Sequence, residues 1–190
     1  MEGEISLWFV RHAVVDGIAG TIHRSEAPAD LRDRAQLEAL RQHLPQDAVS
    51  YASPSQRTTD TARALRLDPI LVPEFREQDF GDWTGQRHDD IAAAGGKSYA
   101  RFWNNPARSR PPGGESFEDQ IVRVRLGLRQ VGTGSAVLVV HSGSIRAALC
   151  IALDLASHAA LRFVVHPLSV TQIDRLSDSW RVVSVNQRIF

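Results

Sequence analysis

The residues best suited to chemistry are an arginine and a histidine that follow a predicted strand. The apolar run at residues 7–10 is typical of a buried strand in a parallel sheet, and Arg11 and His12 come directly after it. In open α/β sheets, ligands bind at the carboxyl edge of the strands. A fixed cation beside an imidazole at that edge is suited to holding an anion while the imidazole attacks it. Since an isolated Arg-His pair is more often structural, this prediction depends on the rest of the chain.

Two further motifs are expected at the same edge. Residues 136–140 form the strongest predicted strand, and His141 and Ser142 follow it at once. A helix predicted to begin at Ser53 brings Arg57 to the edge. Helix N-termini present free N–H groups to anions, and one arginine side chain can bind two phosphate oxygens at once. The sequence therefore predicts a pocket for a phosphate dianion.

The residue types in this pocket favour phosphoryl transfer through a histidine. The neutral imidazole of His12 can attack phosphorus and form a covalent phosphohistidine. Arginines and the second histidine, His141, would offset the charge that spreads over the equatorial oxygens. The leaving alkoxide needs a proton, which an acidic stretch can supply. The carboxyl groups of that stretch are Glu74, Glu77, Asp79 and Asp82.

Other kinds of phosphate chemistry lack their motifs in this chain. A cysteine phosphatase needs an arginine six residues after its cysteine, and the residue six positions after Cys150 is Ala156. Residues 95–98 resemble the end of a P-loop, but the first glycine of that motif would fall on Ile91. No HExxH zinc motif is present. We therefore expect a histidine nucleophile, with no metal and no cofactor.

Composition limits the class of protein and its partners. The 190 residues predict a single domain, 1–190, and 22 basic residues balance 22 acidic ones. With no net charge to favour nucleic acid or membranes, the expected partner is a small phosphomonoester. The single Cys150 excludes an internal disulfide and is expected to be core packing. The acidic start, residues 1–3, differs from a signal peptide, so we expect a cytoplasmic protein. Nothing in the composition indicates an oligomeric state.

The order of predicted elements indicates a three-layer α/β/α sandwich with a mostly parallel central sheet and an antiparallel edge strand. Asp30 is expected to cap a first helix that ends near residue 44, and a later helix is expected from residue 145 to residue 155. Residues 87–104 predict two short helices broken at Gly95-Gly96. With the turn-rich residues that follow, they form an insertion at about 87–114 that we interpret as a lid.

Four motifs in this chain resemble those of the histidine phosphatase (phosphoglycerate mutase-like) superfamily. An Arg-His signature after the first strand is matched by residues 11–12, and a Ser-Pro-x-x-Arg helix start by residues 53–57. The family's acid, a Glu before a Phe-Gly-x-Trp stretch, falls on Glu77. The closing His-x-Gly is matched by residues 141–143. The four motifs keep their order over nearly the whole chain.

The resemblance implies a role for each matched residue. His12 would be the nucleophile and Glu77 the proton donor and acceptor. The residues that would bind the phosphoryl group are Arg11, Arg57, His141 and Ser142.

The chain departs from the family after the first histidine. Many members continue Gly-Glu/Gln-Thr, whereas this chain has Ala13-Val14-Val15. The small polar residue that usually helps to line the pocket is therefore missing. Thr21 and His23, farther along the same loop, are expected to take over phosphate contacts. An interpretation of His23 as an ordinary surface histidine remains open.

Within the superfamily, residues 80–83 and 112–117 resemble α-ribazole phosphatase, an enzyme of the cobalamin pathway. The resemblance implies hydrolysis of α-ribazole 5'-phosphate, with aromatic side chains either stacked on its flat base or packed as lid core. These aromatics are Trp83, Phe102 and Trp103. Glu115 and Ser116 either shape the substrate end of the pocket or cap a helix. The other functions that remain open are a sugar-phosphate or bisphosphate phosphatase, a phosphoglycerate-type mutase, and a phospholigand sensor without catalysis.

Overall fold

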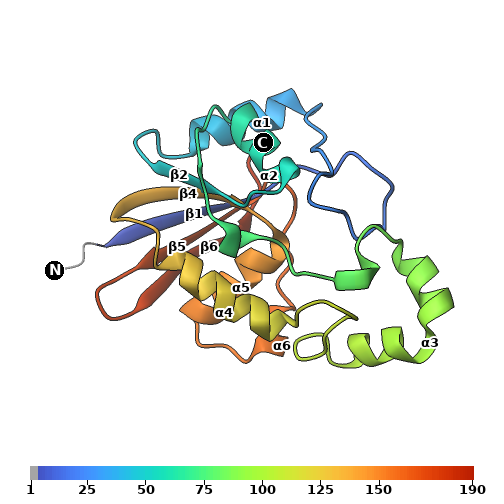
Figure 1. Ribbon diagram of the computed structural model, residues 1–190. Helices are drawn as coiled ribbons and strands as arrows, with labels where there is room; N and C mark the ends of the chain where they lie inside the picture. The colour runs from blue at the N-terminus through green and yellow to red at the C-terminus, as the bar shows by residue number, and fades with distance from the viewer. Residues whose placement is uncertain (1–3) are drawn as a thin grey trace.

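A six-stranded sheet organises the molecule (Figure 1). The computed structural model describes residues 4–190, so the acidic start at residues 1–3 lies outside the described residues. The strands run in the order β3-β2-β4-β1-β5-β6 across the sheet. Their bounds are β1 Ile5–Arg11, β2 Val49–Ala52, β3 Ile70–Leu71, β4 Gly134–Val140, β5 Val170–Arg175 and β6 Trp180–Gln187.

Four neighbouring strands are parallel and two at one side are antiparallel. Strand β4 pairs in parallel with both β1 and β2, and β2 pairs in parallel with β3. Strand β5 runs antiparallel to β1, and β6 runs antiparallel to β5. The predicted α/β/α sandwich with a mostly parallel sheet and an antiparallel edge is therefore confirmed.

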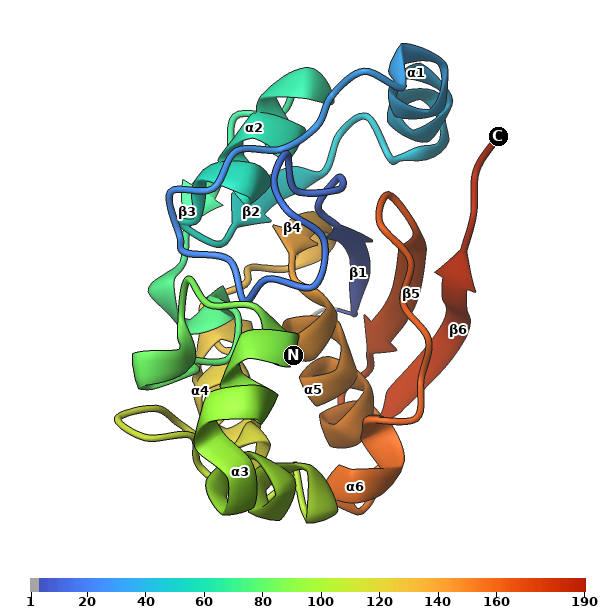
Figure 2. The same cartoon turned by 90° about the vertical axis from the view of Figure 1, so that its right-hand side faces the viewer.

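Helices cover both faces of the sheet. Helices α1 and α2 lie on one face, and α4, α5 and α6 lie on the other (Figures 1 and 2). Helix α3 lies beyond the end of the sheet toward which the parallel strands run (Figure 1). The α-helices are α1 Arg34–His43, α2 Gln56–Ala64, α3 His88–Asn104, α4 Phe117–Leu128, α5 Ser142–Ala152 and α6 Ser157–Ala160. Two 3₁₀ turns, η1 Pro73–Phe75 and η2 Gly81–Trp83, connect β3 to α3.

Strand β4 explains why the sheet needs both helical layers. Val137 and Val139 point into the core beneath α1 and α2, whereas Leu138 and Val140 point into the core beneath α4 and α5. All four side chains are fully buried. Since burial of such a side chain contributes roughly 1.5–3 kcal/mol, a continuous apolar run stabilises a central strand that is covered on both sides.

Three predicted helix starts were wrong. Helix α2 begins at Gln56, after its N-cap Ser55, and not at Ser53. Helix α1 is capped by Asp33, whose carboxylate accepts from the amide of Gln36, whereas Asp30 pairs with Arg32. Helix α5 begins at Ser142, directly after β4, and not near residue 145. Its first turn, Ser-Gly-Ser, has a composition typical of a loop. Tertiary packing overrides that preference, because Gly143 and Ser144 are buried against neighbouring segments.

The predicted break in the third helical region is confirmed. Helix α3 extends from residue 88 to residue 104, but Gly96 inside it has a positive φ of 41° and a ψ of −107°, so the helix consists of two pieces joined at a kink. Four buried side chains, Ile22, Trp83, Ile91 and Phe102, form a small core that joins α3 to the preceding loops. In the described part of the chain, no helix has the length and apolar character needed to cross a membrane.

Candidate active site

A cavity of about 990 Å³ lies at the carboxyl ends of the parallel strands. It lies between the loop after β1, the acidic segment after β3, the start of α5, and residues of α3. Most of the residues that the sequence predicts as site residues line it together. They are Arg11, His12, Thr21, His23, Arg57, Glu77 and Ser142.

The register of β1 and β4 places the two predicted histidines side by side. Arg11 is paired with Val140, so His12 and His141 each follow a paired position, and the His12 amide donates to the Val140 carbonyl at 3.0 Å. Their ring centroids are 5.1 Å apart, with the ring planes at 67°. His141 is fully buried and, unlike His12, is not among the cavity-lining residues. The predicted convergence of the two strand ends is therefore present.

The backbone fixes the tautomer of His12. Its Nδ1 lies 2.6 Å from the carbonyl oxygen of Ala13, which can only accept, so Nδ1 carries the proton. Burial, together with the nearby His141 and Arg57, holds the pKa of His12 well below its usual range. The imidazole is therefore neutral at pH 7, with the lone pair on Nε2. This is the form that a nucleophile requires.

The contact also explains how Ala13 replaces the glycine found in many relatives. Ala13 takes part through its backbone, because its carbonyl accepts from His12 and its amide donates to Thr61 Oγ1 at 3.0 Å. Its φ is not among the positive values in the described chain, so a Cβ is tolerated. The methyl group packs in the core.

Ser53 supports the second histidine. Its hydroxyl group lies 2.9 Å from Nε2 of His141, whereas the buried Nδ1 of His141 contacts no hydrogen-bonding group of the described residues. Burial, with Arg57 and Arg11 nearby, holds the pKa of His141 well below its usual range. If Ser53 donates to Nε2, then Nδ1 carries a proton that it can donate to an anion.

Three arginines place positive charge at the inner end of the cavity. Arg57 is anchored through the carbonyl oxygen of Arg24 at 2.9 Å, and Arg11 through that of Val165 at 2.5 Å. Arg146, on α5, donates from Nε to the carbonyl oxygen of Phe163 at 2.9 Å. Burial lowers the pKa of all three.

Sequence reasoning missed Arg146. It lies one helical turn after Ser142, so both residues face the cavity from α5. This spacing becomes informative only when α5 is known to begin at Ser142.

Among the four acidic candidates, the structure favours Glu77. Its carboxyl group is partly buried at the cavity, and its Oε1 accepts from the amide of Gln78 at 3.1 Å and from Gln120 Nε2 at 3.3 Å. Its charge raises the pKa of Arg11, Arg57 and Arg146 against the effect of burial.

The other acidic side chains are placed differently. Asp79 lines the cavity but is exposed, and its carboxylate accepts from the amide of Gly81 at 2.8 Å. Glu74 and Asp82 are not among the cavity-lining residues. Asp82 lies beside Gly113 in the turn that follows α3.

The aromatic residues divide between lid core and cavity wall. Trp83 is buried and packs edge-on against Tyr99 and Phe102, away from the cavity lining, so of the two alternatives for Trp83 the structure favours lid core over stacking on a substrate. Phe102 and Trp103 line the cavity, and Trp103 is 46% exposed. Within residues 4–190, no three His, Cys, Asp or Glu side chains are grouped as metal ligands are.

Comparison with known proteins identifies the family. The model of the histidine phosphatase superfamily (branch 1) matches residues 7–188. This chain belongs to that superfamily. The chain is 32% identical over 197 residues to a 2,3-bisphosphoglycerate-dependent phosphoglycerate mutase of Methylobacterium radiotolerans, covering 94% of this chain and 92% of the mutase.

Two further similar proteins are phosphatases by name. A glucosyl-3-phosphoglycerate phosphatase of Mycolicibacterium vanbaalenii is 35% identical over 161 residues, covering 74% of this chain and 71% of that protein. The structure of α-ribazole phosphatase from Shigella flexneri superposes with a TM-score of 0.82 at 23% identity, covering 97% of this chain and 98% of that one. At that identity the likeness shows the fold alone. Three further relatives come from Mycobacterium, and this chain spans only 34% of their length.

Proposed function

We propose that this histidine phosphatase is a metal-independent phosphomonoesterase that acts through a phosphohistidine at His12. The observation that carries the proposal is the Nδ1 contact of His12 with the Ala13 carbonyl, since it leaves Nε2 as an unprotonated nucleophile at the cavity. A non-catalytic phospholigand sensor would need the arginines but neither this tautomer nor a carboxyl group beside it.

In the proposed reaction, the phosphoryl oxygens are bound by Arg11, Arg57 and the Nδ1–H of His141. Nε2 of His12 attacks phosphorus in line with the ester oxygen, forming a P–N bond as the P–O bond breaks. Glu77 donates its proton to the leaving oxygen, so the alcohol departs neutral. Glu77 then takes a proton from water, which attacks phosphorus and breaks the P–N bond. The products are the alcohol and phosphate.

The remaining predicted site residues bind phosphate or cover the cavity in the proposed reaction. Thr21 and His23 line the cavity and supply further phosphate contacts, as does Ser142 at the start of α5. Burial, together with the nearby Arg57, lowers the pKa of His23, so His23 acts as a neutral hydrogen-bonding group. Residues 87–114 act as a lid of a single catalytic domain, 1–190.

Two substrate classes have support. The first is α-ribazole 5'-phosphate, because the ring of Trp103, 46% exposed at the cavity wall, offers an aromatic surface for its base. The second is a sugar phosphate or phosphoglycerate ester that carries a further anion, because Arg146 lines the cavity in addition to the two predicted arginines. The similar glucosyl-3-phosphoglycerate phosphatase and phosphoglycerate mutase support this second class, a mutase activity included.

The test is hydrolysis in the presence of EDTA by the wild type, His12→Ala and the control His158→Ala, since His158 is an exposed histidine of α6. The panel contains p-nitrophenyl phosphate, α-ribazole 5'-phosphate, glucosyl-3-phosphoglycerate and 3-phosphoglycerate. We expect turnover with an acid-labile, base-stable phosphoenzyme, both lost in His12→Ala alone. Phosphate binding without turnover would favour the sensor, and isomerisation of 3-phosphoglycerate would favour the mutase. Preference within the panel decides the substrate class.

A further inference from the structure

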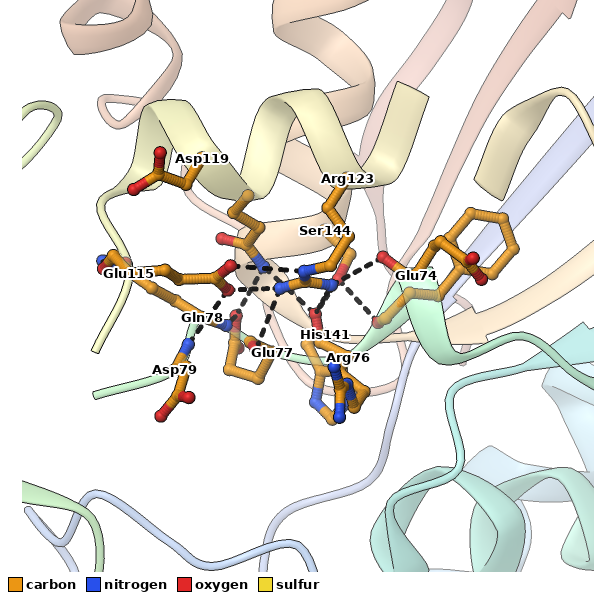
Figure 3. Close-up of polar contacts among 12 residues, drawn as sticks. Glu74, Arg76, Glu77, Gln78, Asp79, Glu115, Asp119, Arg123, His141 and Ser144 are labelled. Atoms are coloured by element: carbon orange, nitrogen blue, oxygen red, sulfur yellow. Dashed lines mark hydrogen bonds and ion pairs between the residues drawn. The ribbon is translucent and has the colours of Figure 1, made fainter. Parts of the chain in front are cut away.

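The backbone that carries Glu77 is held by a side chain from another element, Arg123 of α4. Its Nη1 donates to the carbonyl oxygens of Glu74 and Arg76 at 2.6 and 3.1 Å. Its Nη2 donates to the carbonyl oxygen of Glu77 at 3.3 Å. Figure 3 shows the guanidinium group of Arg123 among these acceptors. One side chain therefore fixes three carbonyl groups of the acidic segment.

Two buried side chains complete the set. Ser144 of α5 donates to the carbonyl oxygen of Phe75 at 2.9 Å, and Gln120 of α4 donates to that of Arg76 at 3.3 Å. The four carbonyl groups at residues 74–77 are therefore all bound by α4 and α5. Residues 74 and 75 end the 3₁₀ turn η1 and residues 76 and 77 follow it, and the last carbonyls of a helical turn need partners from outside the turn.

Glu115 orients Arg123 from the opposite side. Its two carboxylate oxygens accept from Nε and Nη2 of Arg123, the former at 3.3 Å, and Oε1 also accepts from the amide of Asp79 at 3.0 Å. The Glu115 backbone is joined to the same segment, because its amide donates to the Asp79 carbonyl at 2.9 Å and its carbonyl accepts from the Gln78 side chain at 2.9 Å. Only 18% of the Arg123 side chain and 20% of the Glu115 side chain are exposed. Such a shielded, forked pair contributes more than an exposed ion pair.

The hydrogen bonds of Arg123 account for all of its donors. A guanidinium group has five N–H bonds. Two bind the carbonyls of Glu74 and Arg76, one binds that of Glu77, and two bind Glu115. Arg123 therefore has no donor left for a substrate, although it lies at the cavity wall. A lysine, with three donors, cannot make the same set.

We propose that Arg123 and Glu115 form a positioning pair that sets where the carboxyl group of Glu77 stands and so controls proton donation to the leaving group. This inference rests on the proposed function in taking Glu77 as the acid. It also assigns a function to the Pro-Gly-Gly-Glu turn at residues 112–115, because Glu115 connects that turn to the acid-bearing segment.

The decisive experiment compares substrates whose leaving groups differ in their need for a proton. An aryl phosphate such as p-nitrophenyl phosphate leaves with little assistance, whereas an alkyl phosphate such as glycerol 3-phosphate depends on it. In Arg123→Gln, Arg123→Lys and Glu115→Gln, we expect kcat/KM for the alkyl substrate to fall about 10- to 100-fold, within the range for general acid catalysis. We expect kcat/KM for the aryl substrate to change by less than about threefold, because this constant reports the steps up to departure of the leaving group and not the later hydrolysis of the phosphoenzyme.

A matched control is available on the same side of α4. Arg110 forms a two-bond ion pair with Asp119 at 2.7 Å that is exposed and does not touch residues 74–77. Arg110→Gln should leave the ratio of the two kcat/KM values unchanged. Equal losses on both substrates in a folded Arg123 or Glu115 variant, or no loss on either, would overturn the proposal.

Hydrogen–deuterium exchange separates this inference from the proposed function. We expect the Asp79 amide, which donates to Glu115, to exchange faster in Glu115→Gln than in the wild type or in Arg110→Gln. If the wild type hydrolyses neither substrate, the proposed function fails. Hydrogen–deuterium exchange alone then tests the positioning pair. Unchanged exchange at residues 77–79 in Glu115→Gln would then overturn the pair.

Discussion

Gly143 leaves the space that the carboxyl group of Glu77 occupies. A Cβ on Gly143 would overlap Glu77 Oε1, and it would also stand within 2.7 Å of Gln120 Oε1. Gly143 lies in the first turn of α5 and does not have a positive φ, so its backbone conformation does not demand glycine. The glycine of the His-x-Gly motif therefore has a steric reason that joins the motif to the acidic segment.

Replacing Gly143 with alanine should damage the reaction without damaging the fold. The added methyl group would push the carboxyl group of Glu77 away from α5, and a displacement of about 1 Å can cost roughly 100-fold in rate. We expect kcat for an alkyl phosphate to fall by about that factor in Gly143→Ala, with the unfolding temperature nearly unchanged. Steady-state kinetics and thermal unfolding measure both quantities.

The control for this variant is Gly132→Ala. A Cβ there would meet only Tyr51 Oη, at 3.8 Å, which is an ordinary contact. Full activity in Gly143→Ala would mean that Glu77 stands elsewhere during catalysis. A loss of equal size in Gly132→Ala would show that the effect is not specific to the site.

The stability of the ligand-free protein should fall as the pH falls below about 6.5. Burial lowers the pKa of His12 and of His141 in the folded state, so below pH 6.5 the unfolded chain binds more protons than the folded one. Each histidine then destabilises the fold by about 1.4 kcal/mol per pH unit until its folded pKa is reached. At this chain length, 1 kcal/mol corresponds to roughly 2–4 °C in Tm.

Thermal unfolding between pH 7.5 and pH 5.5 measures this slope. We expect the dependence of stability on pH to be less steep in His12→Asn than in the wild type. The exposed control His158→Asn should keep the wild-type slope. The same slope in His12→Asn and in the wild type would mean that His12 is not held neutral by the fold.

The chemistry at the strand ends could be predicted from the sequence because it follows from parallel pairing. Residues 7–10 and 136–140 are apolar enough to identify two buried strands, and the residues after them must share an edge if the strands are neighbours. The convergence of His12 and His141 therefore needed no three-dimensional information beyond the fold class.

The supporting contacts could not be predicted in the same way. Arg123 binds carbonyl groups nearly 50 positions earlier in the chain, and backbone carbonyls are the same in every residue type, so no sequence pattern marks them. From the sequence, a helix cap is a better-supported role for Glu115 than a substrate contact. In the structure Ser116 is the cap, in a capping box with Asp119, and Glu115 binds Arg123 instead.

Arg57 should contribute mainly to the transition state. Its anchor on the Arg24 carbonyl leaves the rest of the guanidinium group at the cavity, near His12 and His141. Removing one donor to developing charge typically costs about 100- to 1,000-fold in kcat. We expect a loss of that size in Arg57→Ala and only partial recovery in Arg57→Lys, because lysine cannot form the forked contact. A change in KM alone, with kcat unchanged, would contradict a role in the transition state.

Arg146 should discriminate between the two substrate classes. Only its Nε has a protein acceptor, the Phe163 carbonyl, and within the described residues no acidic side chain forms an ion pair with it. Within the described residues, its remaining donors are therefore available to a second anionic group of the substrate, such as a carboxylate. In Arg146→Gln we expect kcat/KM for a phosphoglycerate ester to fall about 10- to 100-fold, in keeping with the roughly 1.5–3 kcal/mol of a charged hydrogen bond.

Substrates without the second anion provide the internal control. Glycerol 3-phosphate and α-ribazole 5'-phosphate should lose less than about threefold, since neither carries a carboxylate for Arg146 to bind. In Trp103→Ala we expect kcat/KM to fall more for α-ribazole 5'-phosphate than for the phosphoglycerate ester. Trp103 lies at the cavity wall and offers contact area to a flat base but little to a carboxylate. Equal losses on all substrates in Arg146→Gln would place Arg146 at the phosphoryl group itself, which would remove the structural support for a doubly anionic substrate.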